Sequence, residues 1–232
     1  MHSSLRTLVA VLVLAAVTAG AAGDALAQRA GRVPSSRPAI ELSATYGSMW
    51  GGNVPTRYGK LRTATGDSWG FALDYPLQPS TWVEIGYNRQ SGALDWDPSL
   101  GSKITLTDMS VNHWHLDGVR GFGRPDGAVM PYVVSGLGFT HYAFDKDAVS
   151  IDGEDYAIDS STRFMLNFGV GFKAYVGQAR RVGIRGSFRV FSTLYDAGGG
   201  FYFGTGGASL GVGGSAIWQY EAAGGVTVKL GG

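Results

Sequence analysis

The stretch Arg163-Phe164-Met165-Leu166-Asn167-Phe168-Gly169-Val170-Gly171-Phe172-Lys173-Ala174 alternates between two kinds of residue. Every even-numbered position is apolar, whereas the odd-numbered positions hold charged, amide and glycine residues apart from Met165. A period of two residues is that of a β-strand, whose successive side chains point to opposite faces of a sheet. The stretch therefore predicts a strand with one apolar face and one polar face.

The same alternation recurs in seven further segments of the chain. They span about residues 40–50, 68–75, 82–88, 104–120, 129–143, 182–194 and 218–230. Together with 163–174 they make eight strands, and closure of an antiparallel barrel requires an even number. The sequence therefore predicts an all-β fold, an eight-stranded antiparallel up-and-down transmembrane β-barrel.

The connections between these segments alternate in length. Those at 76–79, 121–127 and 177–180 are short, and those at 51–64, 90–103, 144–161 and 196–214 are long. Outer-membrane barrels have short periplasmic turns and longer extracellular loops. We therefore expect a location in the cell outer membrane, with both termini periplasmic and the long loops extracellular.

The distribution of charge over the two strand faces separates a membrane barrel from a soluble one. The charged residues within the strands lie opposite the large apolar ones; they are Asp74, Glu84, Lys173, Arg185, Arg189 and Glu221. Turned inward, these residues can pair and close the lumen, and Gly86, Gly169 and Gly171 on the same face leave room for long side chains. The rings on the other face would then meet lipid; they are Tyr46, Trp50, Trp69, Phe71, Tyr75, Phe164, Phe168, Phe172, Trp218 and Tyr220.

The alternative is a soluble periplasmic lipocalin-like barrel that binds a ligand and turns its apolar face inward. Eight strands enclose room for side chains or for one small ligand, and this many rings would overfill that space. We therefore favour the membrane barrel.

The N-terminus has the pattern of a cleaved signal peptide. Arg6 precedes an apolar run over 8–17, and Ala25-Leu26-Ala27 forms a cleavage site. The run is shorter than the roughly 20 residues that a membrane-spanning helix needs. We expect residues 1–27 to be the signal peptide, 28–38 a periplasmic lead-in and 39–232 the barrel.

Composition excludes several classes of function. The chain of 232 residues contains no cysteine, which excludes disulfides and thiolate chemistry, and its formal net charge of +1 offers no attraction to nucleic acid. We expect no cofactor and no enzymatic activity.

Three segments could hold a site, although a structural explanation is favoured for each. His113 and His115 share a strand face and could form a weak metal site, but lumen-side or interfacial histidines are the favoured interpretation. The fifth connection is rich in oxygen ligands, yet it lacks calcium-loop spacing and is interpreted as a solvated external loop. Its acidic residues are Asp145, Asp147, Asp152, Glu154, Asp155 and Asp159. The glycine-rich segment 198–214 is interpreted as an external loop.

The motifs Phe168-Gly169-Val170-Gly171-Phe172, Pro131-Tyr132-Val133 and Gly136-Leu137-Gly138-Phe139 add a family resemblance. Over about residues 39–230 the chain resembles the OmpA-like and OmpW-like small outer-membrane β-barrel proteins of Gram-negative bacteria. The resemblance implies a barrel that is surrounded by outer-membrane lipids, inserted by the barrel-assembly machinery, and monomeric. It implies a structural or surface-contact role; the alternative is a narrow channel for small or hydrophobic solutes.

Overall fold

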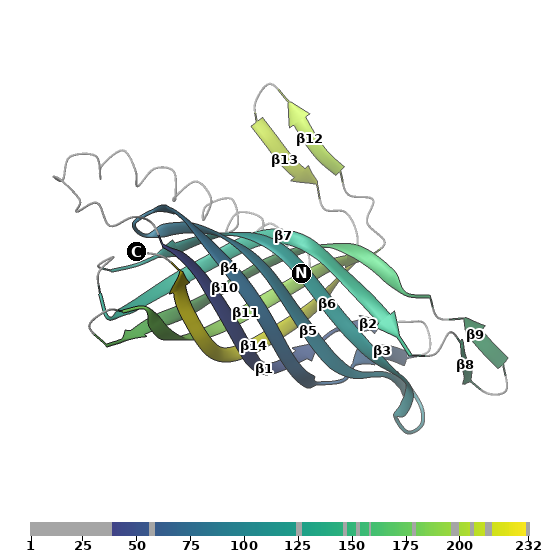
Figure 1. Cartoon of the computed structure of the whole chain (residues 1–232). Coiled ribbons are helices and arrows are strands. Elements are labelled where there is room, and N and C mark those ends of the chain that lie inside the picture. The colour runs from purple at the N-terminus through teal and green to yellow at the C-terminus, as the bar shows by residue number, and fades with distance from the viewer. Residues whose placement is uncertain are drawn as a thin grey trace. The chain divides into compact units, whose positions relative to one another are not determined.

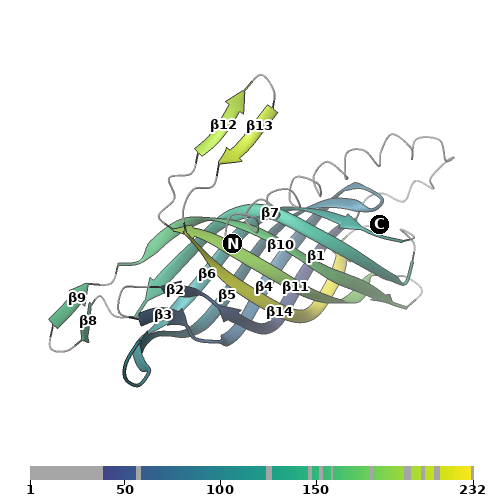
Figure 2. The same cartoon turned by 180° about the vertical axis from the view of Figure 1, so that it is seen from behind.

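The computed structural model describes residues 39–55, 59–123, 127–145, 148–151, 154–157, 159–177, 180–195, 200–204, 207–211 and 215–230. Eight long strands form one antiparallel sheet that closes on itself (Figure 1 and Figure 2). They are β1 (Ile40–Gly51), β4 (Gly66–Gln78), β5 (Thr81–Pro98), β6 (Ile104–Gly121), β7 (Val129–Phe144), β10 (Ser161–Val176), β11 (Val182–Tyr195) and β14 (Ser215–Leu230). The predicted eight-stranded barrel is confirmed.

Each long strand pairs with the next long strand along the chain. The sheet runs β1–β4–β5–β6–β7–β10–β11–β14, and β14 pairs with β1 from Leu230 opposite Ile40 to Gln219 opposite Gly51. This order is up-and-down, and the ring of pairings has no free edge among the eight strands. Closure satisfies the backbone hydrogen bonds of every strand within the sheet, as a bilayer requires.

The long connections contain short strands that the sequence analysis did not predict. They are β2 (Asn53–Pro55), β3 (Gly59–Thr63), β8 (Ala148–Ile151), β9 (Glu154–Ala157), β12 (Gly200–Gly204) and β13 (Gly207–Gly211). β8 pairs with β9 and β12 with β13, each as a separate two-stranded sheet. Segments interpreted as plain loops therefore contain hairpins.

The β2–β3 hairpin extends the barrel wall. Gly51 and Gly52 have φ angles of 99° and 81°, a conformation that glycine adopts without strain, and there the chain turns out of β1. β3 then pairs with the far end of β5, with Lys60 opposite Asp97. β5 continues to Pro98 instead of ending near residue 88, because this hairpin gives its last residues a partner.

Some predictions concern segments that lie outside the described residues. The signal peptide over 1–27, the lead-in over 28–38, and Asp147 and Asp152 of the acidic connection are among them. Within the described part of the chain, no helix is long and apolar enough to cross a membrane.

Candidate functional site

The barrel interior carries a row of four carboxylates. Glu41 on β1 lies opposite Asp74 on β4, Asp74 lies opposite Glu84 on β5, and Glu84 lies opposite Asp117 on β6. Like charges directly opposite one another on neighbouring strands destabilise a sheet. This acidic row therefore needs cations from elsewhere in the barrel.

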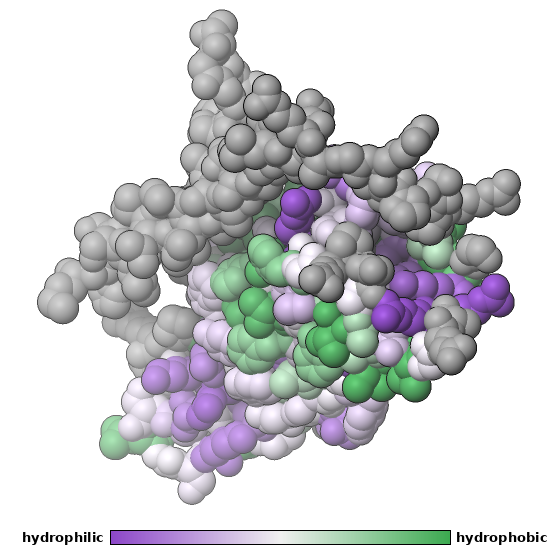
Figure 3. All heavy atoms as spheres, turned by 90° about the vertical axis from the view of Figure 1, so that its left-hand side faces the viewer, coloured by the Kyte–Doolittle hydropathy of each residue, from purple (hydrophilic) through white to green (hydrophobic). Residues whose placement is uncertain are grey.

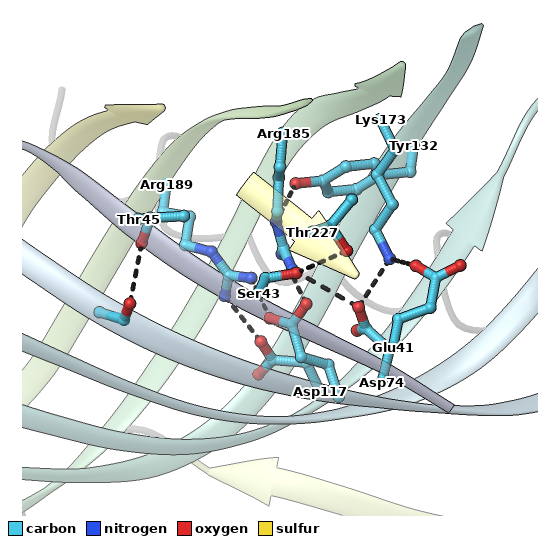
Figure 4. Close-up of polar contacts among 12 residues, drawn as sticks. Glu41, Ser43, Thr45, Asp74, Asp117, Tyr132, Lys173, Arg185, Arg189 and Thr227 are labelled. Carbon is cyan, nitrogen blue, oxygen red and sulfur yellow. Dashed lines mark hydrogen bonds and ion pairs between the residues drawn. The ribbon is translucent and has the colours of Figure 1, made fainter. Parts of the chain in front are cut away.

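β10 and β11 supply those cations across the lumen, as Figure 4 shows. Lys173 on β10 lies opposite Arg185 on β11, and its Nζ is 2.6 Å from both Glu41 Oε2 and Asp74 Oδ2. Arg185 Nη2 lies 2.5 Å from Glu84 Oε2. Each cation thus bridges strands that are not its neighbours in the sheet.

Arg189 completes the network. It pairs through Nη2 with Glu84 Oε1, and its Nη1 lies 2.7 Å from Asp117 Oδ2. Glu84 is therefore held by two guanidinium groups while it is fully buried. Breaking one buried pair by removing a partner costs about 3–5 kcal/mol, because an uncompensated charge remains.

Neutral side chains form hydrogen bonds with atoms of the charged groups that the ion pairs leave without a partner. Arg185 Nε donates to the Tyr132 hydroxyl at 3.0 Å, and Asn167 Nδ2 donates to Asp117 Oδ1 at 2.8 Å. The structure buries all six charges that the sequence assigned to the lumen, none more than 3% exposed. Glu221, which we expected to pair with an arginine or lysine, accepts two 2.9 Å hydrogen bonds from Asn88 Nδ2 instead.

His115 lies between Asn88 and Asp117. Its Nε2 is 2.8 Å from Asn88 Oδ1, and its Nδ1 is 2.8 Å from Asp117 Oδ2, although outside ideal hydrogen-bond alignment. Because the Asn88 amide nitrogen donates to Glu221, Asn88 Oδ1 must accept and Nε2 must donate.

Both histidines singled out by the sequence lie in the lumen and are buried. Within the described residues, Glu84, His115 and Asp117 bring three possible metal-ligand atoms within 4.8 Å of one another. Arg185 and Arg189 already form ion pairs with Glu84 and Asp117, however, so the negative charge that a metal ion would need is neutralised. His113 stacks flat on Phe191 at 4.3 Å and its Nδ1 lies 2.9 Å from Thr140 Oγ1.

Apolar layers flank the charged network along the barrel axis. On the short-turn side they comprise Trp82, Val119, Met130, Tyr132, Val134 and Tyr175. On the side of the long connections they comprise Met109, Val111 and Tyr142. Figure 3 looks toward the short-turn end, where hydrophobic and hydrophilic residues lie side by side.

The outer face carries aromatic and aliphatic side chains. Tyr46, Phe71 and Tyr75 are each more than half exposed, and Trp69, Phe172 and Trp218 are at least one-third exposed. Trp50, Phe164, Phe168 and Tyr220 are half-buried against neighbouring rings of this face. All ten rings assigned to this face by the sequence therefore lie on it.

Two registered rows on the outer face mark a boundary. An aromatic row runs around five strands as Phe71, Tyr87, Trp114, Phe139 and Phe164. The next row toward the long connections begins with Trp69 on β4 and then becomes polar, with Arg89, Asn112, His141 and Thr162. Aromatic residues concentrate where a membrane meets water.

Comparison with known proteins supports the same fold. Over 84% of this chain and 97% of the other, the structure is similar to the outer membrane protein OprG from Pseudomonas aeruginosa, with a TM-score of 0.60 and 13% identity. Neisserial surface protein A matches 82% of this chain and 97% of its own, with a TM-score of 0.50 and 16% identity. The chain has the fold of the small outer-membrane β-barrels.

The likeness carries the fold and not an activity. The outer membrane protease OmpT from Escherichia coli matches 87% of this chain and 99% of its own at a TM-score of 0.50, with only 9% identity. No family model and no curated protein matches the sequence. Function must therefore be argued from the barrel itself.

Sequence reasoning missed several members of the network. Asp117 follows His113 and His115 at intervals of two residues along β6. Alternation therefore predicts that all three side chains lie on the same face of the strand. Glu41 shares a face with Ser43, which is buried. Asn88 shares the inner face of Glu84, and Asn167 that of Lys173, so alternation placed both inside. Their partners, and the role of Tyr132, depend on the strands that face them across the lumen.

Proposed function

We propose that this protein is an integral outer-membrane protein whose lumen is closed by the salt-bridge network and whose role is structural or surface contact. The carrying observation is the distribution of polarity over the two faces. The charges are buried inside, while Leu42, Phe71, Ile85, Leu116 and Val170 are each between 40% and 60% exposed outside. A barrel in lipid has this polarity.

The soluble ligand-binding alternative requires the reverse arrangement. Its outer face would meet water, and its interior would hold an apolar ligand. Here the space that such a ligand would occupy is crossed by Lys173, Arg185 and Arg189, which pair with the acidic row. The outer-face apolar surface would also favour aggregation in water.

Closure of the lumen argues for a contact role over a transport role. Ion pairs join β10 and β11 to β1, β4, β5 and β6, and apolar layers lie on both sides of them. In the proposed orientation, the short turns and both termini are periplasmic. The long connections, with the ends of β5 and β6, then stand at the cell surface and are the part of the protein that can meet a partner.

Heat-modifiable migration tests this proposal. The chain is refolded in detergent, and boiled and unboiled samples are compared by electrophoresis. A closed, fully hydrogen-bonded barrel resists the denaturing detergent until heated, so we expect the unboiled sample to migrate differently. Identical migration, together with a monomeric protein in detergent-free buffer, would reject the membrane barrel.

A further inference from the structure

A cavity of about 580 Å³ lies at the end of the barrel that carries the long connections. Its lining includes the side chains of Trp50 on β1 and Tyr220 on β14. The β2–β3 hairpin adds Asn53 and Arg62 to the lining. Asp95 on β5 and Lys103, just before β6, also line it. The volume falls within the roughly 300–1,000 Å³ of typical ligand pockets.

Side chains of the outer face contribute much of the cavity lining. Trp50 and Tyr220 belong to the outer-face rings. Asp95 is buried and lies opposite the exposed Arg62 in the register of β3 and β5. Thr63, which pairs with Leu94 of the inner apolar layer, lines the cavity as well.

One side of the cavity is aromatic. The rings of Trp50 and Tyr220 lie 6.4 Å apart with an interplanar angle of 25°. Trp50 also contacts Phe188 at 6.1 Å, so the ring is supported from the side. Aromatic rings that line a cavity offer an apolar surface at which a ring-shaped ligand can stack.

The polar side of the cavity is pre-organised and nearly neutral. Lys103 Nζ lies 2.6 Å from Asp95 Oδ2, and Thr105 donates to Asp95 Oδ1 at 2.8 Å. Arg62 donates from Nε to Asn53 at 3.2 Å and lies 3.5 Å from Asp97. Two cations thus face two carboxylates, which gives little net attraction for a bare anion. Lysine has three donors and arginine five, so both keep donors for a ligand.

We propose that this cavity binds a saccharide unit, a chemistry that fits both of its sides. A pyranose ring has apolar C–H faces, which match Trp50 and Tyr220. Its hydroxyl groups donate and accept hydrogen bonds, which match Asn53, Arg62 and Lys103. The sugar comes either from a free glycan or from the headgroup of a glycolipid in the outer leaflet, and the second source rests on the proposed membrane location.

Tryptophan fluorescence of the refolded full chain tests the site. The detergent is a polyoxyethylene ether, because maltoside detergents would compete for a saccharide site. Two probes are titrated separately, delipidated core oligosaccharide and lipopolysaccharide in phosphatidylethanolamine vesicles, with plain vesicles as the blank. We expect saturable binding that Trp50→Leu weakens about tenfold or more and that Arg62→Gln weakens to a lesser degree.

Trp114→Leu is the matched control, since Trp114 is an outer-face tryptophan of β6 that does not line the cavity. Saturation by the free oligosaccharide assigns the site to the sugar itself, and saturation by the glycolipid vesicles alone assigns it to a membrane headgroup. No saturable response to either probe, or a response that Trp50→Leu leaves intact, overturns the inference. The heat-modifiability assay on the same samples tells this failure apart from failure of the membrane barrel.

Discussion

Gly86 shows how tightly the inner face of the barrel is packed. It lies opposite His115 in the register of β5 and β6, and a Cβ at this position would overlap the imidazole ring. The same relation holds between Gly171 and the ring of Tyr132. His115 cannot turn away without leaving Asn88 and Asp117, so the space above Gly86 is required.

We expect Gly86→Ala to lower the free energy of unfolding by about 1–3 kcal/mol, the cost of overpacking a filled interior. Urea unfolding of the refolded barrel in micelles measures it. Gly118→Ala on β6 is the control, because its Cβ would meet only the Ser135 carbonyl oxygen at 3.9 Å. In a His115→Ala background the cost should fall; an equal cost in both backgrounds would show that the imidazole is not the obstacle.

At the scale of elements, the acidic row places repelling carboxylates on four neighbouring strands. The cations on β10 and β11 offset this repulsion across the lumen. β6 contributes Asp117 and β11 contributes Arg189, and no backbone pairing connects these two strands. Their coupling is therefore a measure of how far the network holds the opposite sides of the barrel together.

We expect Asp117→Asn and Arg189→Met each to destabilise the barrel by about 3–5 kcal/mol, because each leaves a buried charge with fewer partners. The double variant should cost less than the sum, since it removes the pair as a unit. Urea unfolding followed by tryptophan fluorescence gives the coupling energy. Strict additivity would mean that the two side chains act independently.

The strands themselves were predictable because alternation is a local property. Phe164 to Phe172 reads as a strand without knowledge of its neighbours, and all eight long strands occur where the period of two occurs. The ends were less predictable. The alternation in β5 ends near residue 88, but the strand continues for ten more residues to Pro98. It does so because β3 and β6 pair with these residues, and no local sequence pattern predicts that pairing.

At the scale of the whole molecule, the proposed closure of the lumen by the network predicts how the barrel conducts. Arg185 crosses the lumen to Glu84, and its guanidinium lies 5.3 Å from the centre of the Tyr132 ring. Removing this side chain opens space at the centre of the barrel and leaves acidic groups to attract cations.

In planar bilayers we expect the wild-type barrel to show little conductance and Arg185→Ala to raise it, with preference for cations. Arg89→Ala on the outer face is the control and should behave as wild type. An unchanged conductance in Arg185→Ala would remove the network as the closing element. An open wild-type barrel would instead favour the narrow channel.

The sequence by itself determined the eight long strands and which of their two faces carries the charged residues, because strand periodicity places these in the primary structure. The tertiary structure alone decided which acid meets which base. Glu41 and Lys173 are 132 positions apart, and their contact depends on the register of every intervening strand and on closure of the ring. A shift of one residue in one strand would move its charges to the lipid face. The lumen network and the cavity are therefore properties of the closed barrel and not of any segment.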